Sequence, residues 1–128
     1  MRKHLPSLVL VNTSHLMDKV LYSKFTFSCQ PDISVYSKEI NHKYENNLSL
    51  VEFPIEFKTT VDQDPFIVVN PVLPSDTDLT TKYPFMSMTS QGCLTAGQIT
   101  AYATSILSVQ YSTHTFLILI LKPFARLI

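Results

Sequence analysis

Residues Val51–Lys58, VEFPIEFK, are the stretch that decides the fold. Apolar and polar side chains alternate along it, which is the period of a half-buried β-strand. The alternation assigns the residues to two faces: Val51, Phe53, Ile55 and Phe57 on one, and Glu52, Pro54, Glu56 and Lys58 on the other. The polar face ends in Glu-x-Lys. It is therefore either a sheet edge exposed to water or what remains of a metal-dependent active site.

The residues before this stretch predict its neighbours. Pro31–Tyr36, PDISVY, has a proline at its entrance and then alternates, so it is predicted as a strand. Leu48–Lys58 is expected to form a hairpin with it across the polar connector Ser37–Asn47. Further upstream, the apolar spacing of His15–Phe25 predicts a short helix.

The residues after it begin with a long proline-rich loop, 59–84, in which only Phe66–Val69 has the composition of a short strand. Four aspartates of this loop are expected to be solvated: Asp62, Asp64, Asp76 and Asp78.

The most regular helical pattern follows, in TAGQITAYATSILSVQY, residues 95–111. Thr95 and Gln98 have the spacing of a capping box, which places the start of the helix there. Phe116–Leu121, FLILIL, does not alternate and is predicted as a strand buried on both faces. Phe124–Ile128, FARLI, is expected to be its hairpin partner.

The whole pattern predicts one α/β domain over residues 1–128, with a mixed central sheet, flanking helices and residues 98–111 packed across the sheet. Because the chain stops within its last strand, at Ile128, we expect a C-terminally truncated product. An incomplete sheet leaves an apolar edge exposed, so we also expect a protein partner or self-association through that edge.

Composition excludes several classes of function. Ten basic and ten acidic residues give zero net charge, so nucleic acid is not an expected partner. Two distant cysteines, Cys29 and Cys93, form no zinc or redox motif and favour a reducing compartment. Two glycines cannot build a glycine-rich phosphate loop. The apolar runs predict neither a signal peptide nor a membrane span, so we expect the cytoplasm or nucleus.

Five polar residues form the candidate site: Asp32, Glu56 and Lys58, with Gln98 and Tyr102 in support. Asp32 and Glu56 are candidate Mg²⁺ ligands, because hard cations prefer carboxylate oxygens. Such a metal would polarise a phosphate and activate a water, while Lys58 orients that water. The simpler interpretation is that these residues occur together by chance, that Gln98 closes the capping box and that Tyr102 belongs to the core. His114 is expected to be a hydrogen-bonded structural residue.

Asp followed by Glu-x-Lys and then a Gln-x-x-x-Tyr helix resembles the PD-(D/E)xK nuclease-like fold. That resemblance implies a core in the order helix, three strands, helix, strand. It also implies catalysis by Asp32, Glu56 and Lys58, with Mg²⁺ as the cofactor.

A longer resemblance covers residues 17–128. The segments PDISVY, VEFPIEFK, DPF and GQITAYATSILSVQYSTHTFLILILKPFARLI are similar to the amino-terminal region of the fungal-type protein kinase family. Matching positions are Gly97, Gln98, Tyr102 and Ala103, then Gln110, Tyr111, Thr113, His114 and Phe116, and finally Ala125–Ile128. Ser112 departs from the family, which has arginine there.

The chain carries no VAIK strand, no HRD loop and no DFG, so it lacks the groups that transfer phosphate in that family. The resemblance therefore implies a non-catalytic interaction or regulatory module. A metal-dependent nuclease is the alternative, and an orphan structural fragment without a function is the third possibility.

Overall fold

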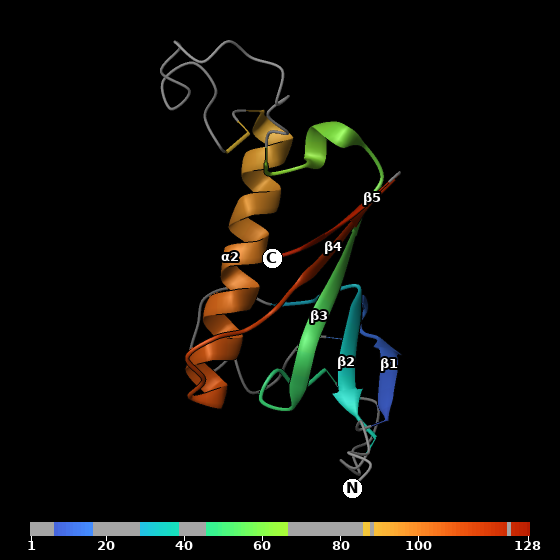
Figure 1. The fold of residues 1–128 in the computed structure, drawn as a ribbon, viewed down its shortest axis with the longest axis vertical. Coiled ribbons are helices and arrows are strands. Elements are labelled where there is room, and N and C mark those ends of the chain that lie inside the picture. The colour runs from blue at the N-terminus through green and yellow to red at the C-terminus, as the bar shows by residue number, and fades with distance from the viewer. Residues whose placement is uncertain (1–6, 17–28, 39–45, 67–85, 88, 123) are drawn as a thin grey trace, which may run out of the picture.

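Five strands and one long helix make up the part of the chain that the structure describes (Figure 1). The computed structural model describes residues 7–16, 29–38, 46–66, 86–87, 89–122 and 124–128. The elements are β1 (Leu8–Asn12), β2 (Ile33–Ser37), β3 (Val51–Lys58), the 3₁₀ turn η1 (Val61–Gln63), α2 (Ser90–Gln110), β4 (Ile118–Leu121) and β5 (Phe124–Leu127). This confirms the predicted mixed α/β class.

The strands form one sheet in chain order, β1-β2-β3-β4-β5. Neighbours are antiparallel except β3 and β4, which are parallel. Parallel neighbours need a crossover connection, because the chain must return to the end of the sheet from which it started. The crossover contains α2, which packs on one side of the sheet. We call the side under α2 the inner face and the opposite side the outer face.

The strand β3 alternates, and the side that carries the glutamate is covered by α2. Glu56 keeps 3% of its surface exposed, whereas Phe57 keeps 45%. The polar side is buried because α2 packs on that side and supplies polar partners there. Ile55, on the same side as Phe57, keeps only 7% of its surface exposed. Both sides of the strand are therefore buried at its centre, and the expectation of a buried apolar side is wrong at Phe57.

A bulge also breaks the predicted grouping of side chains. Val35 pairs with Phe53 and Tyr36 pairs with Val51, so one residue of β3 has no pairing partner on β2. An extra residue shifts the alternation by one position. Val51 therefore joins the core on the inner face, while Phe53 lies on the outer face.

The core lies between α2 and the inner face. It consists of the buried residues Val11, Cys29, Tyr36, Leu48, Val51, Ile99, Tyr102, Ile106, Leu117, Leu119 and Leu121. The strand β4 contributes Leu119 and Leu121, while Ile118 and Ile120 between them are only half-buried. The prediction that FLILIL is buried on both faces is wrong, because no helix among the described residues covers the outer face.

The helix α2 starts one and a half turns earlier than predicted. Its N-cap is Thr89, whose side-chain oxygen accepts a hydrogen bond from the backbone of Gly92 at 3.0 Å. Thr95 lies inside the helix and donates to the carbonyl of Gln91 at 3.1 Å. The capping box at Thr95 is therefore wrong. Tyr111 ends the helix in the left-handed conformation, with φ of 53°.

Two predicted elements lie largely beyond the described residues. Of the helix predicted over His15–Phe25, only His15, in a turn, and Leu16 are described. The proline-rich loop is described up to Phe66, which forms an isolated bridge with Met86. The strand β1 was not predicted, although it pairs with β2 along its whole length. None of the described helices is long and apolar enough to cross a membrane.

Candidate functional site

The Glu-x-Lys motif of β3 lies on the inner face, against α2. Lys58 Nζ donates to Glu56 Oε1 at 2.7 Å, and the two side chains keep 13% and 4% of their surface exposed. Residues two apart on a strand point to the same face, so the motif itself brings the charges together. A pair this far from water needs additional hydrogen bonds, because desolvation of both charges is costly.

Two residues of α2 supply those bonds. Gln98 Oε1 accepts from Lys58 Nζ at 2.8 Å, and Gln98 Nε2 donates to the Tyr102 hydroxyl at 2.9 Å. The hydroxyl lies 3.3 Å from Glu56 Oε2, which closes a ring of four side chains. We call Glu56, Lys58, Gln98 and Tyr102 the polar ring. The predicted spacing of four residues between Gln98 and Tyr102 does place them on one helix face.

Tyr102 stays protonated in this setting. Burial raises the pKa of its hydroxyl above the ordinary value, and the negative charge of Glu56 raises that pKa further. As a phenol it has one hydrogen to donate, and two acceptors lie within reach. These are Glu56 Oε2 and the backbone carbonyl of Gln30, the latter at 3.0 Å. Tyr102 thereby ties α2 both to β3 and to the segment before β2.

Asp32 lies beside the polar ring without joining it. Its Oδ2 accepts a hydrogen bond from the backbone nitrogen of Phe57 at 2.8 Å. Ile33 pairs with Ile55, so Asp32 is level with Glu56 on the neighbouring strand. All five predicted site residues are therefore gathered at one end of β2 and β3.

The arrangement fits a magnesium ion poorly. Mg²⁺ requires near-octahedral oxygen coordination, and this chain would offer the carboxylates of Asp32 and Glu56. Both oxygens of Glu56 already have partners in the polar ring, one of them the ammonium of Lys58. Within the described ranges, no three His, Cys, Asp or Glu side chains are grouped so as to hold a metal. A cation at Glu56 would have to compete with the ammonium of Lys58, which already neutralises that carboxylate.

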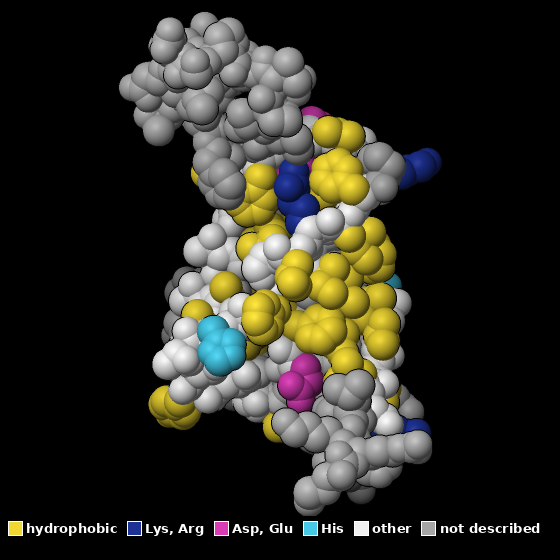
Figure 2. All heavy atoms as spheres, viewed as in Figure 1, with side chains coloured by type: hydrophobic (Ala, Val, Ile, Leu, Met, Phe, Trp, Pro, Cys, Tyr) yellow, Lys and Arg dark blue, Asp and Glu magenta, His cyan; other side chains and the backbone are white. Residues whose placement is uncertain are grey.

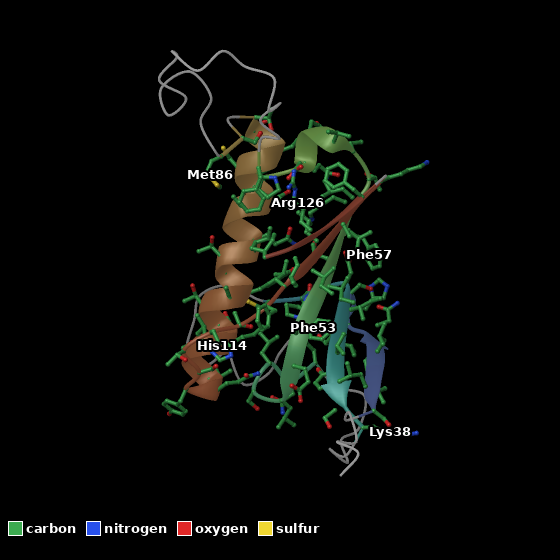
Figure 3. The ribbon with its side chains drawn as sticks, viewed as in Figure 1. Lys38, Phe53, Phe57, Met86, His114 and Arg126 are labelled. Carbon is green, nitrogen blue, oxygen red and sulfur yellow. The ribbon has the colours of Figure 1, made fainter. Side chains whose placement is uncertain are left out.

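A second charged cluster was not predicted. Asp64 keeps 5% of its surface exposed and accepts a forked contact from Arg126, with Nε at 2.9 and 3.0 Å and Nη2 at 2.6 Å. The guanidinium also lies 5.6 Å from the ring centre of Phe66 and 5.1 Å from that of Phe124. Figure 3 shows Arg126 where β5 meets the segment after β3.

Asp64 is therefore not a solvated loop residue, whereas Asp62 is exposed as expected. The other two aspartates of that prediction, at 76 and 78, lie outside the described residues. The sequence did contain a signal for the contact between Asp64 and Arg126. Asp64 opens the DPF segment and Arg126 lies in FARLI, and both segments belong to the longer resemblance.

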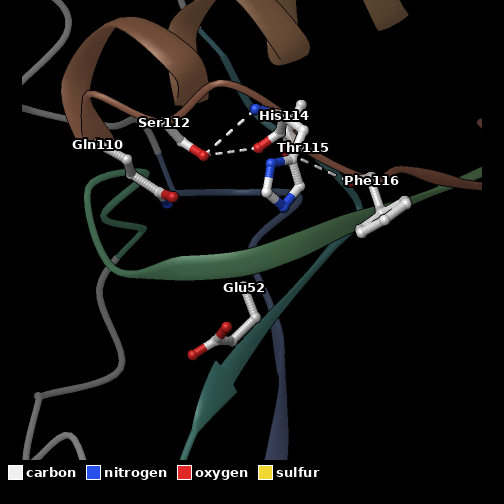
Figure 4. A pocket seen from close by; sticks show the side chains of 6 residues that line it. All are labelled: Glu52, Gln110, Ser112, His114, Thr115 and Phe116. Carbon is white, nitrogen blue, oxygen red and sulfur yellow. Dashed lines mark hydrogen bonds between the residues drawn. The ribbon is translucent and has the colours of Figure 1, made fainter.

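A polar hollow of about 220 Å³ lies at the other end of α2 (Figure 4). It is lined by Glu52, Gln110, Ser112, His114, Thr115 and Phe116. The His114 ring meets the Phe116 ring edge-on at 6.0 Å and lies 3.3 Å from the Thr113 hydroxyl. Gln110 donates to the carbonyls of Leu48 and Val51 at 2.9 and 2.6 Å. Its amide thus serves the fold, by fixing the turn that leads into β3.

Comparison of the chain with protein-family models, with curated proteins and with solved structures finds no match.

Proposed function

We propose that this chain is a non-catalytic interaction module related to the amino-terminal region of fungal-type protein kinases. The observation that carries the proposal is the closed polar ring. Lys58 Nζ has two acceptors and Glu56 uses both oxygens, so neither charge is presented to a substrate. In this role, the Glu-x-Lys motif holds α2 on the sheet.

Four of the residues that match the kinase family support this assignment through their contacts in the fold. Gln98 and Tyr102 are half of the polar ring. Gln110 bonds two carbonyls at the entrance to β3, and Arg126 clamps Asp64. Motif positions that each make a long-range structural contact are those a domain needs in order to fold. The proposed relationship is therefore one of architecture, and it requires no catalysis.

A metal-dependent nuclease remains the second candidate. Three strands, a helix and a parallel strand follow one another in the order of the PD-(D/E)xK core. In addition, Asp32 is level with Glu56 on the adjacent strand. Both points favour a shared architecture, whereas the occupied oxygens of Glu56 disfavour activity.

Nuclease assays decide between the two. Purified protein would be incubated with single-stranded DNA, double-stranded DNA and RNA, each with Mg²⁺, with Mn²⁺ and with chelator. We expect no metal-dependent cleavage and no shift of the melting temperature with either ion. Glu52→Gln, which changes an exposed glutamate of the same strand, is the matched control for Glu56→Gln. Cleavage that requires metal and is lost in Lys58→Ala and Glu56→Gln but kept in Glu52→Gln would overturn the proposal.

A further inference from the structure

The strand β1 forms one edge of the sheet, so half of its backbone groups point away from the other strands (Figure 1). Bonded positions alternate along an antiparallel pair. Thr13 N donates to the carbonyl of Asp32 at 3.0 Å, which places Thr13 among the residues bonded towards β2. In the regular register of β1 with β2, the outward residues are then Leu8, Leu10 and Asn12. We call the backbone N–H and C=O groups of these three residues the free edge.

The free edge is open and unprotected. Among the described residues, none is hydrogen-bonded to it. Unpaired edges are templates for another strand, and folded proteins block them with charged residues, proline or bulges. The sequence of β1, LVLVN, has neither charge nor proline, and β1 pairs with β2 without a bulge. Leu8 keeps 47% of its surface exposed and Leu10 keeps 61%. Figure 2 shows apolar side chains gathered over the strands, with Lys and Arg side chains towards the top and bottom of the view.

The free edge is complementary to a second copy of itself. An antiparallel pairing centred on Leu10 places Leu10 opposite its own copy and Leu8 opposite Asn12. Each such pair exchanges two backbone hydrogen bonds, so all the groups of the free edge find partners. The same pairing brings Val9 opposite Val11 on the inner face, and pairs of β-branched side chains stabilise adjacent strands.

We propose that β1 pairs antiparallel with β1 of a second copy of this chain, which joins two five-stranded sheets into one continuous sheet. This deepens the proposed interaction function, on which it rests, by naming the partner. A contact of this symmetry requires a strand that tolerates its own copy, because each residue meets itself or its reciprocal. No charged residue occurs between Ser7 and Ser14, so no like charges meet. A foreign strand would cover one free edge, whereas a second copy covers two with the same contact.

The opposite edge, β5, does not offer an equivalent contact. Leu117 and Ile128 exchange backbone hydrogen bonds at 2.9 Å, so the outward residues of β5 are Ala125 and Leu127. A symmetric pairing of these two residues places Arg126 opposite its own copy, and like charges directly opposite each other are destabilising. Pairing of β1 with β5 of another copy repeats without closing and gives an open-ended ribbon. The proposed contact therefore lies at the edge opposite to the one expected from the end of the chain.

Proline substitution at the two edges tests the proposal. Leu10→Pro removes an N–H that points away from β2, so the ladder within the domain is kept while the dimer contact loses its central pair. In sedimentation equilibrium, wild-type protein should fit a monomer–dimer equilibrium, and Leu10→Pro should weaken dimerisation by roughly tenfold or more. Ala125→Pro makes the matched change at an outward residue of β5 and should leave the dimerisation constant unchanged. Circular dichroism and melting curves establish that both variants fold.

Opposite charges test the symmetry of the contact without proline. Because Leu10 faces its own copy, Leu10→Lys and Leu10→Glu should each be monomeric alone but should form a heterodimer when mixed. Hydrogen exchange locates the contact in the wild type. The amides of Leu8, Leu10 and Asn12 should exchange more slowly as protein concentration rises, whereas association through a face of the sheet would leave their exchange unchanged.

Four results would overturn the proposal. They are a wild-type protein that stays monomeric at its solubility limit, a mass that keeps rising beyond the dimer, dimerisation that Ala125→Pro weakens as much as Leu10→Pro, and a Lys/Glu mixture that does not associate. None of these results bears on the absence of nuclease activity, which the cleavage assay tests separately.

Discussion

The hydroxyl of Tyr102 on α2 lies 3.3 Å from Oε2 of Glu56 on β3, and both residues are buried. The contact joins two elements separated by 46 residues in sequence. Within the polar ring it gives the carboxylate of Glu56 a second partner, beside Lys58. The stability of the domain should therefore depend on the ring as a unit.

Replacing Lys58 by methionine should destabilise the fold strongly. The change keeps the side-chain length but leaves the carboxylate of Glu56 buried without its cation. Breaking one side of such a pair costs about 3 kcal/mol. The double variant Glu56→Gln/Lys58→Met should lose much less than the sum of the single changes, because no charge is left unpaired. Urea unfolding of the four proteins measures this coupling, and additive losses would contradict the ring.

Removing the hydroxyl of Tyr102 should change how stability responds to alkaline pH. The pKa of Tyr102 is raised in the folded protein, whereas in the unfolded chain it is about 10. Above pH 10 the unfolded chain releases this proton while the folded protein retains it, so folding loses stability as pH rises. In Tyr102→Phe this contribution disappears, and stability should decline less between about pH 10 and pH 11.5. At neutral pH the variant should lose about 1 kcal/mol for the missing hydrogen bonds.

Tyr111→Phe is the matched control for that measurement, because Tyr111 keeps 90% of its surface exposed. Its pH profile, recorded by urea unfolding in the same buffers, should coincide with that of the wild type. Equal slopes for wild type and Tyr102→Phe would show that Tyr102 ionises equally well in both states.

The Asp64–Arg126 clamp should stabilise the domain where β5 meets the loop after β3. Asp64→Asn removes the charge from a buried, forked contact and should cost about 2 kcal/mol. Asp62→Asn makes the same change at an exposed aspartate two residues away and should cost less than about 0.5 kcal/mol. Thermal unfolding of both variants checks the difference. A loss of the same size in both would mean that the forked contact does not form in solution.

The two glycines of α2 should respond oppositely to alanine. A Cβ at Gly97 would meet nothing within 4 Å, so Gly97→Ala should stabilise the helix, by roughly 0.5–1 kcal/mol. A Cβ at Gly92 would lie 2.6 Å from the Ser87 hydroxyl and 2.8 Å from that of the capping residue Thr89. Gly92→Ala should therefore cost about 1 kcal/mol by disturbing the cap. Melting temperatures that move in the same direction would contradict this assignment of the helix start.

Periodicity identified the elements that have a strong local signal. The strands β2 and β3, the β4–β5 hairpin and the body of α2 follow from alternation, from helical spacing and from the proline before FARLI. Thr95 misled the prediction because a threonine inside a helix can bond the carbonyl four residues back, as it does here with Gln91. No sequence pattern marked the start of α2 at Thr89, because its cap consists of one side-chain hydroxyl and one backbone nitrogen.

The candidate site likewise has one part that local spacing predicted and one part that it did not. Spacing of two on a strand predicted that Glu56 and Lys58 share a face, and spacing of four on a helix predicted the same for Gln98 and Tyr102. Local spacing carries no information about which residues from distant elements meet. The contact of Lys58 with Gln98, the carbonyl of Gln30 beneath Tyr102 and the pairing of Asp64 with Arg126 therefore came only from the packed fold.

The sequence by itself determined that VEFPIEFK is an amphipathic strand in a mixed α/β domain, because alternation records which side chains share a face. Only the tertiary structure decided which face is covered. The crossover helix packs on the side of Glu56 and Lys58, where Gln98 and Tyr102 compensate the buried charges. Phe53 and Phe57 are left on the opposite side because of where α2 packs, and no local pattern encodes that choice.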